Sequence, residues 1–375
     1  MLAASDAPEL TTLGDSLRKF AESLRVTPAR GIEFRRNDFT SMAELGLTGM
    51  AVDERCGGTA MSQFASALAI FELARAQLGP AIYLSVHLMV ARLLQRHANN
   101  ELHFEALRQL ADGRSLGAFA LSEAEAGSDA ASLRTKAERT KDRYILSGEK
   151  LYITSGNVAD IYLVFARTGA PGAEGITAFL VKRDTPGLSF GRPEKKMGCE
   201  GAPITAVHLE NCALPPEARL GAESEGYSIA LSGLNGGRAN IAAAACGLSA
   251  RALEICCAHV KQRSQFGKQL SEFQGLQFML SDMAIQLRAA LLLTRDAAQE
   301  LDRGGADNFP SSVAKCFATD AAMEITTNAV QVLGGAGYLE EYEVERLMRD
   351  AKMLQIVEGT NQIQRIVIAR ELLRG

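Results

Sequence analysis

The spacing of hydrophobic residues changes twice along the 375-residue chain. Near the N-terminus, apolar residues recur at three- and four-residue steps: Leu13, Leu17, Phe20 and Leu24. This spacing predicts an amphipathic helix. Two further helices are predicted over residues 65–78 and 81–97, with Gly79-Pro80 separating them. Residues 1–117 are therefore expected to form a helical domain.

Beyond residue 117 the pattern becomes that of short strands. Residues 160–168, 176–182 and 204–210 are rich in β-branched and aromatic residues, and segments with Gly, Pro and Asn separate them. Residues 118–224 are therefore predicted to form an antiparallel β domain. No helical crossovers lie between these strands, which argues against a doubly wound nucleotide-binding sheet.

From residue 225 to the end the spacing is helical again. One long apolar stripe consists of Phe273, Leu276, Leu280, Met283, Leu287 and Leu291. Four or five such helices predict an antiparallel bundle over residues 225–375. The expected fold class is α+β multidomain: an N-terminal helical domain, a middle antiparallel β domain and a C-terminal helical bundle.

Composition narrows the function classes. The net charge is −4 and the pI is near 5.9, whereas a nucleic-acid-binding protein would show a basic excess. The first residues lack a basic segment followed by an apolar one, so no secretory signal is expected. Residues 241–260 are apolar but contain Arg251 and Glu254, so we expect a buried helix there and no membrane span.

The seven cysteines include no CxxC pair, and their number is odd. Free, mostly buried thiols in a reducing compartment fit this pattern best. That compartment would be the cytoplasm, or the mitochondrial matrix in a eukaryote. The five histidines do not pair with cysteines at ligand spacing, so no metal site is predicted.

Two motifs of the middle region combine small and polar residues. AFALSEAEAGSDAAS begins as a strand and ends in a turn whose amides and Ser128 hydroxyl could hold a phosphate, although Gly-Ser-Asp is also a common turn. In GEKLYITSGNVAD, Tyr152 and Thr154 share one strand face because side chains alternate. An aromatic ring beside a hydroxyl suits a planar cofactor; the alternative is an ordinary half-buried strand.

The helical region contains two arginines and a glycine cluster of interest. Arg238 is expected at the start of an otherwise apolar helix, where a buried cation would need a partner. Arg263 with Phe266-Gly267 ends that helix, or is a surface arginine followed by a glycine C-cap. The glycines of QVLGGAGY would let a backbone approach closely, or would only break a helix.

A single carboxylate, Glu358, stands in the middle of MLQIVEGTNQIQR. Gly359 is expected to break one helix, and Thr360 or Asn361 to cap the next. Apolar residues predict a buried side for that last helix: Ile363, Ile366, Val367 and Leu372. Taken alone, this motif places Glu358 in a solvated loop.

Together these motifs resemble the acyl-CoA dehydrogenase family over nearly the whole chain. ALSEAEAGSDA resembles the first family signature, and QVLGGAGYLEEYEVERLMRDAKMLQIVEGTNQIQR resembles the second. The resemblance implies an N-terminal helical domain, a middle β domain and a C-terminal four-helix bundle. Residues 175–198, 233–242 and 81–87 most resemble the isobutyryl-CoA dehydrogenase branch, which acts on a short branched acyl-CoA.

The resemblance implies that Glu358 is a catalytic base that removes the α proton of an acyl-CoA while the β hydrogen leaves as hydride to flavin N5. Desolvation would make this carboxylate bind its proton more readily, as a base working near neutrality requires. The Glu358 amide would stabilise charge on the thioester oxygen together with a flavin hydroxyl. Gly359 would leave room for substrate, and Ser128 and Arg238 would also lie near it, Arg238 mainly supporting Glu358.

The resemblance also implies one FAD per chain and a set of contacts to it. Phe119, Leu121 and Ser122 would border the flavin ring, Gly127 and Ser128 the pyrophosphate. Further contacts are implied for Tyr152 and Thr154 beside the ring and for Thr360 and Gln362 beyond it. A neighbouring subunit would supply contacts to the adenine half: Arg263, Phe266, Gln331 and Gly335. The expected assembly is a homotetramer, and the expected electron acceptor is electron-transfer flavoprotein.

The chain departs from the family pattern at four positions. Ala124-Glu125 replaces the usual Pro-Gly of the first signature, and Tyr152 stands where Trp is common. Gly237 occupies the place where some relatives carry their base, which leaves Glu358 as the single candidate. The alternatives are an acyl-CoA oxidase of the same fold, a non-catalytic acyl-CoA- or flavin-binding protein, and a purely structural helical protein.

Overall fold

The computed structural model describes residues 8–26, 30–305 and 307–374. The N-terminal helices are α1 (Pro8–Leu24), α2 (Arg36–Glu44), α3 (Gln63–Ala76), α4 (Leu78–His97) and α5 (Glu101–Ala111). Helices α3 and α4 are buried on nearly all sides, and both pack against the long helix α6 of the C-terminal part.

The break between α3 and α4 lies at Gln77, two residues earlier than the sequence predicted. Gln77 is extended, with φ −157° and ψ 130°, and α4 already begins at Leu78. Pro80 therefore lies in the first turn of α4, where a missing amide proton costs no helical hydrogen bond. A Cβ atom at Gly79 would lie 2.1 Å from the Glu200 carbonyl oxygen, so this glycine permits close packing on the middle domain.

The middle domain is one sheet with strand order β6-β7-β3-β2-β4-β5-β8, and β1 pairs with β4. The strands are β1 (Gly117–Ala120), β2 (Lys136–Arg139), β3 (Tyr144–Thr154), β4 (Ile161–Arg167), β5 (Ile176–Lys182), β6 (Leu188–Phe190), β7 (Ile204–Leu214) and β8 (Arg219–Leu220). The predicted strands correspond to β4, β5 and β7. The sheet is not wholly antiparallel, however. Strand β4 runs parallel to β1, and it also runs parallel to β2, with which it shares a single residue pair.

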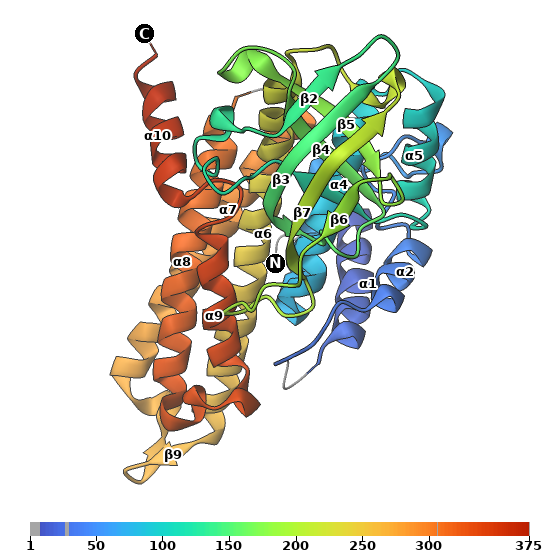
Figure 1. Cartoon of the computed structure of the whole chain (residues 1–375). Coiled ribbons are helices and arrows are strands. Elements are labelled where there is room, and N and C mark those ends of the chain that lie inside the picture. The colour runs from blue at the N-terminus through green and yellow to red at the C-terminus, as the bar shows by residue number, and fades with distance from the viewer. Residues whose placement is uncertain (1–7, 27–29, 306, 375) are drawn as a thin grey trace.

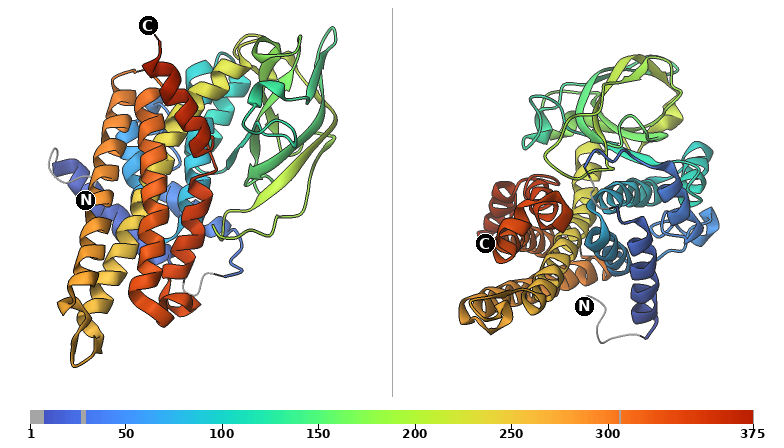
Figure 2. Two further views of the ribbon diagram at one scale, coloured as in Figure 1. Left: turned by 90° about the vertical axis from the view of Figure 1, so that its left-hand side faces the viewer. Right: turned by 90° about the horizontal axis from the view of Figure 1, so that it is seen from below.

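The C-terminal part is helical. Its helices are α6 (Gly226–Gln262), α7 (Gln274–Asp302), α8 (Phe309–Leu333), α9 (Val344–Leu354) and α10 (Asn361–Leu372). A two-stranded hairpin, β9 (Ser264–Gln265) and β10 (Lys268–Gln269), connects α6 to α7, and a 3₁₀ turn (Gly334–Tyr338) follows α8. Seen from below, α6 lies between the N-terminal helices and the C-terminal helices α8, α9 and α10 (Figure 2).

The three helices α4, α6 and α7 are long and apolar enough to cross a membrane, judged by length and composition only. The apolar window of 18 residues on which this judgement rests is 83% buried inside the structure in α4 and 67% buried in α6. The apolar residues of these two helices, including the predicted buried helix at 241–260, thus form the core. In α7 only 22% of the window is buried, so much of its apolar surface is uncovered in a single chain.

Candidate active site

Glu358 lies in the connection between α9 and α10, in an uncommon backbone conformation. Its φ is +58°, and that of Gly359 is +89°. Two consecutive left-handed residues, one of them a glutamate, persist only where surrounding contacts hold them. The side-chain amide of Gln364 supplies such contacts by donating to the carbonyls of Glu358 and Gly359, at 3.1 and 2.9 Å.

The Glu358 carboxylate faces Gly237 on helix α6. A Cβ atom at Gly237 would lie 2.4 Å from Oε2 of Glu358, so any side chain there would displace the carboxylate. Oε2 is buried and has no hydrogen-bond partner among the described residues. Burial raises the pKa of Glu358 to about 7, although the nearby cations Arg238 and Lys315 act in the opposite direction.

Arg238 lies in the interior of α6, whereas the sequence predicted it at the start of a helix. The guanidinium is buried; its Nε lies 3.4 Å from the Glu358 carbonyl oxygen, and one terminal nitrogen donates to Asn235 Oδ1 at 3.1 Å. Twelve residues of α6 precede Arg238, the expected start of the helix. Their glycines and polar residues weakened the helical pattern, although tertiary packing makes the helix continuous.

Lys315 is a second buried cation beside Glu358, and the sequence analysis missed it. Its Nζ donates to the Gly359 carbonyl at 2.9 Å and to Asn361 Oδ1 at 2.7 Å. Burial lowers the pKa of Lys315 to about 8. The one sequence signal was a lysine within the apolar pattern of residues 309–333, where a charged residue needs a buried partner.

Helix α10 turns polar residues inward, contrary to the predicted apolar side. Asn361 and Gln364 are buried, and the Asn361 amide donates to Thr319 Oγ1 at 2.8 Å and to Asp320 at 2.6 Å. Ile366 and Leu372 are exposed instead. Tertiary hydrogen bonds to α8 therefore decide the orientation of this helix within one chain. Thr360 caps it, as predicted, by accepting from the Ile363 amide at 3.3 Å.

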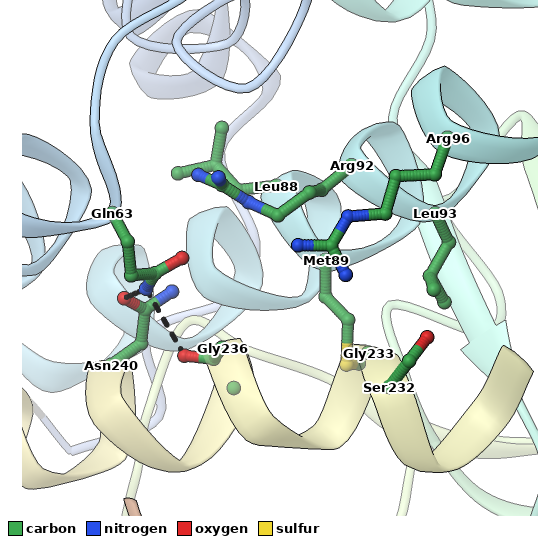
Figure 3. Close-up of a pocket in the computed structure, with 11 residues that line it drawn as sticks. Gln63, Leu88, Met89, Arg92, Leu93, Arg96, Ser232, Gly233, Gly236 and Asn240 are labelled. Atoms are coloured by element: carbon green, nitrogen blue, oxygen red, sulfur yellow. Dashed lines mark hydrogen bonds between the residues drawn. The ribbon is translucent and has the colours of Figure 1, made fainter. Parts of the chain in front are cut away.

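A pocket opens beside Gly237, between helices α4 and α6 (Figure 3). The space among its lining residues is about 300 Å³ when open solvent is included, but the enclosed part is only about the size of one water molecule. Residues from three helices line it: Gln63, Leu88, Met89, Arg92, Leu93, Arg96, Ser232, Gly233, Gly236, Gly237 and Asn240. The Gln63 amide spans the pocket wall by donating to Asn240 Oδ1 at 2.8 Å and to the Gly236 carbonyl at 3.2 Å. Because Gly237 also lies against Glu358, this pocket is next to the carboxylate.

The first group of predicted cofactor contacts lies on β1 and the loop after it. Phe119 is half-buried at the end of β1, and Leu121 is buried. Ser122 accepts from the Leu151 amide at 2.9 Å through its carbonyl oxygen, which fastens this loop to β3. Gly127 and Ser128 are exposed farther along the loop, where their backbone and hydroxyl groups can meet a ligand.

A buried ion pair anchors the same loop. Lys150 on β3 is fully buried, and its Nζ donates to Glu123 Oε1 at 2.6 Å and to the Leu121 carbonyl at 3.1 Å. Glu123 in turn accepts from the amides of Arg134 and Thr135 at 2.5 and 3.0 Å. The loop that carries Ser122 and Ser128 is thereby held from both ends.

Tyr152 and Thr154 lie at the end of β3, close in sequence to this anchor. The Tyr152 side chain is 67% exposed and its φ is +60°. The pairing of β3 with β7 shifts register between Lys150 and Ile153, so the regular alternation behind the predicted common face is interrupted here. An exposed aromatic ring on a rigid strand fits the stacking partner of a planar group such as a flavin.

The remaining predicted cofactor contacts divide between two ends of the C-terminal helices. Thr360 and Gln362 lie with Glu358 at the start of α10. Exposed residues at the opposite end, near the β9–β10 hairpin and the end of α8, form the other set: Arg263, Phe266, Gln331 and Gly335. Figure 1 shows β9 and α10 at opposite ends of the bundle. One chain therefore does not bring the two sets together.

The hairpin itself replaces the predicted glycine C-cap. Phe266 and Gly267 have φ values of +51° and +77° and form the two-residue turn between β9 and β10. Two left-handed residues ending in glycine are typical of tight hairpin turns. Arg263 directly precedes β9 and ends α6, as expected.

The described residues contain no group of three or more His, Cys, Asp and Glu side chains that could hold a metal ion. All seven cysteines are free thiols; Cys257 is half-buried and the other six are buried. The catalytic candidates near the pocket are therefore the carboxylate, the two cations and the backbone around Gly359.

Three family models together match nearly the whole chain. The N-terminal domain of acyl-CoA dehydrogenase matches residues 7–114, the middle domain 118–212 and the C-terminal domain 224–373. An acyl-CoA dehydrogenase of Bacillus subtilis is 42% identical, with 96% of each chain covered. The mitochondrial isobutyryl-CoA dehydrogenase of Bos taurus is 40% identical over 88% of this chain and 80% of its own length.

Solved structures agree in fold. Butyryl-CoA dehydrogenase from Megasphaera elsdenii is 38% identical with a TM-score of 0.95, and 99% of each chain is covered. A chain from a study of the electron transferring flavoprotein of Acidaminococcus fermentans is also 38% identical, with a TM-score of 0.96 and coverage of 99% of this chain and 100% of that one. The three-part fold expected from the sequence is thus confirmed.

Proposed function

The chain belongs to the acyl-CoA dehydrogenase family, and on that premise we propose that Glu358 is the base of its reaction. It is an FAD-dependent acyl-CoA dehydrogenase. The observation that carries the proposal is the position of the Glu358 carboxylate, which is buried at Gly237 beside the pocket and has one oxygen without a hydrogen-bond partner. A carboxylate in this state is ready to accept a proton from a substrate.

The electrostatic setting suits proton abstraction near neutral pH. A base is most effective when its pKa lies near the working pH, and that of Glu358 is about 7. Burial raises this value, while Arg238 and Lys315 keep the charged form accessible. When bound, FAD accepts the β hydrogen as a hydride, which completes the removal of two hydrogens.

The residues around Glu358 hold its main chain in place. Gln364 and Lys315 bind the carbonyls of Glu358 and Gly359, and Arg238 lies 3.4 Å from the first of them. These contacts fix the two peptide groups that follow the Cα atom of Glu358, and the Glu358 N–H lies in the peptide group just before it. We assign this amide to the thioester oxygen, where it stabilises the negative charge that develops as the α proton leaves.

The FAD contacts are assigned to two chains. Phe119, Leu121, Ser122, Gly127, Ser128, Tyr152, Thr154, Thr360 and Gln362 would hold the flavin and pyrophosphate of one chain's cofactor. Arg263, Phe266, Gln331 and Gly335 would reach the adenine half of the cofactor in a neighbour. The separation of these sets within one chain supports this assignment and a homotetramer built on it (Figure 1).

The electron acceptor and the substrate branch are part of the proposal. Likeness to a chain from a study of an electron transferring flavoprotein supports that class of protein as the acceptor. A short acyl-CoA of the isobutyryl type is supported by the bovine relative, although relatives with other substrate names have similar identity. Reduced thiols and the mitochondrial bovine relative support the cytoplasm, or the matrix in a eukaryote.

The test of the base is Glu358→Gln, which keeps the shape but removes the proton acceptor. We expect the rate of flavin reduction by acyl-CoA under anaerobic conditions to fall by ~10²–10⁴. FAD content and acyl-CoA binding should be retained, because neither requires proton transfer. Glu324→Gln, at an exposed position on α8, is the matched control. Flavin bleaching at the wild-type rate in Glu358→Gln would exclude Glu358 as the base.

A further inference from the structure

Two arginines of helix α4 stand over the pocket that lies next to Glu358. Arg92 and Arg96 are one helical turn apart, and both line the pocket. Figure 3 shows the Arg96 guanidinium between α4 and α6, above Gly233, whereas the Arg92 side chain extends sideways toward the side of Gln63. Arg92 is half-buried, whereas Arg96 is exposed at the mouth. The wall of an acyl pocket thus carries two positive charges.

Neither guanidinium has a carboxylate within ion-pair distance among the described residues. The one hydrogen bond of Arg92 to a side chain goes to Ser66 Oγ at 3.4 Å. Asp302 is near enough to favour the charged form, but its carboxylate accepts from the Gln63 and Phe64 amides at 2.5 and 3.1 Å. Burial and the like charge of Arg96 lower the pKa of Arg92.

Two other shielded cations of the molecule do have a carboxylate partner. Lys150 binds Glu123, and Arg75 donates to both oxygens of Glu254 at 2.9 and 2.7 Å. A half-buried guanidinium without such a partner is free to bind one, and a planar carboxylate is the group that it binds best. The pocket therefore offers positive charge to an anion that the chain itself does not supply.

The pocket adjoins the proposed reaction centre. Gly233, Gly236 and Gly237 form its floor on α6, and Gly237 touches Glu358. A Cβ atom at Gly233 would lie 2.6 Å from Leu93, so the floor cannot carry larger residues without displacing α4. Gly233 and Gly237 are one turn apart, ~6 Å along the helix. A short acyl chain that lay along these glycines would extend from the base toward the arginines.

We propose that the acyl group of the substrate carries a carboxylate at its far end and that Arg92, assisted by Arg96, binds this carboxylate. The inference rests on the proposed function of Glu358 as the base, and it replaces the isobutyryl type of substrate with short ω-carboxyacyl-CoA thioesters. The reaction removes two hydrogens: the α proton passes to Glu358 and the β hydrogen, with its electron pair, to FAD. The distal carboxylate is retained in the enoyl product. An uncharged isobutyryl group would leave the arginines unpaired.

The test compares charged and neutral acyl groups of equal carbon number. Holoenzyme is mixed anaerobically with glutaryl-CoA and valeryl-CoA, with adipyl-CoA and hexanoyl-CoA, and with isobutyryl-CoA, and flavin bleaching is followed. We expect the better dicarboxylate to exceed its neutral counterpart in kcat/KM by ~10-fold or more, as a charge-assisted pair predicts. A ratio of one or less, or a preference for isobutyryl-CoA, overturns the inference.

Variants then test whether Arg92 causes the preference for acyl groups with a distal carboxylate. Arg92→Met should bring the ratio of dicarboxylate to neutral substrate close to one, and Arg92→Lys should restore part of it. Arg114→Met, an exposed arginine on another face, should leave it unchanged. A ratio that survives Arg92→Met overturns the role of Arg92. If Arg92→Met does not retain FAD, the ratio of kcat/KM for the dicarboxylate to that for the neutral substrate is compared between Arg92→Lys and the wild type instead. A ratio that is unchanged in Arg92→Lys overturns the role of Arg92. If no acyl-CoA bleaches the flavin of the wild-type protein, the proposed function itself fails.

Discussion

The two ends of the C-terminal helices are built in opposite ways. At the α9–α10 end, polar groups are buried and paired: Lys315, Asn361 and Gln364 hold the backbone around Glu358. At the hairpin end, large side chains lie outside: Phe266 is 93% exposed and Tyr338 84%. The first end is organised by its own chain, whereas the second presents contact groups that the same chain does not use.

The difference teaches which part of the site is complete in one chain. A catalytic group must be held within a fraction of an ångström, and the hydrogen bonds around Gly359 provide that rigidity. A shared cofactor contact needs an accessible surface instead. The uncovered apolar residues of α7 and α10, such as Ile285 and Leu372, extend this accessible surface. The following changes probe the two ends separately.

Gly237→Ala should have the largest effect of these changes. The new methyl group would lie 2.4 Å from Glu358 Oε2, so the carboxylate must move away from the pocket. We expect flavin reduction by substrate to slow by ~10²-fold, in line with the sensitivity of reactions to small misplacements. Stopped-flow absorbance measures this rate, and FAD content should stay at the wild-type level.

The matched control for that change is Gly275→Ala on α7, where an added Cβ meets nothing within 4 Å. It should keep the wild-type rate. A Gly237→Ala protein with an unaltered rate would show that the carboxylate has another productive position.

Lys315→Met should change the pH dependence of flavin reduction. The proposed base works in its charged form, so the rate in the wild type should rise with pH and level off above about 7, the pKa of Glu358. Lys315 is a cation that lowers the pKa of Glu358, so its removal should raise this pKa. The rising limb of the pH–rate profile should then move to higher pH by ~1 pH unit.

Lys352→Met, which removes an exposed lysine of α9, is the control for this profile. Lys315 also binds the Gly359 carbonyl, so a lower plateau is expected as well. The pH of the rising limb reports the electrostatic effect on Glu358, whereas the height of the plateau reports the lost contact with Gly359. A rising limb that moves to lower pH would contradict the electrostatic role of Lys315.

Arg263→Ala should have the smallest effect and act on the other end. If Arg263 binds the cofactor of a neighbour, its removal should weaken FAD retention several-fold and shift the assembly toward smaller species. Flavin absorbance after gel filtration and sedimentation velocity measure the two quantities. Arg143→Ala, an exposed arginine of the middle domain, should change neither. Full FAD occupancy in a monomeric wild-type protein would contradict the shared site.

Local patterns in the sequence determined the order of the three parts and several elements. Residues 176–182 form β5 with the predicted limits, because a buried strand needs a continuous apolar run bounded by turns. The limits of the domains themselves, 1–117, 118–224 and 225–375, stay predictions. Glu358 was selected by resemblance to a family signature, since the local pattern around it predicted a solvated loop.

Tertiary structure decided the features that depend on partners distant in the sequence. The approach of Gly237 to Glu358 spans more than a hundred residues, and so do the contacts of Arg238 with the same segment. The inward polar face of α10 follows from hydrogen bonds to α8, which no periodicity records. Likewise, Arg92 is an ordinary helical arginine in the sequence. Its meaning comes from the pocket that it lines and from the absence of a carboxylate within ion-pair distance among the residues the structure describes.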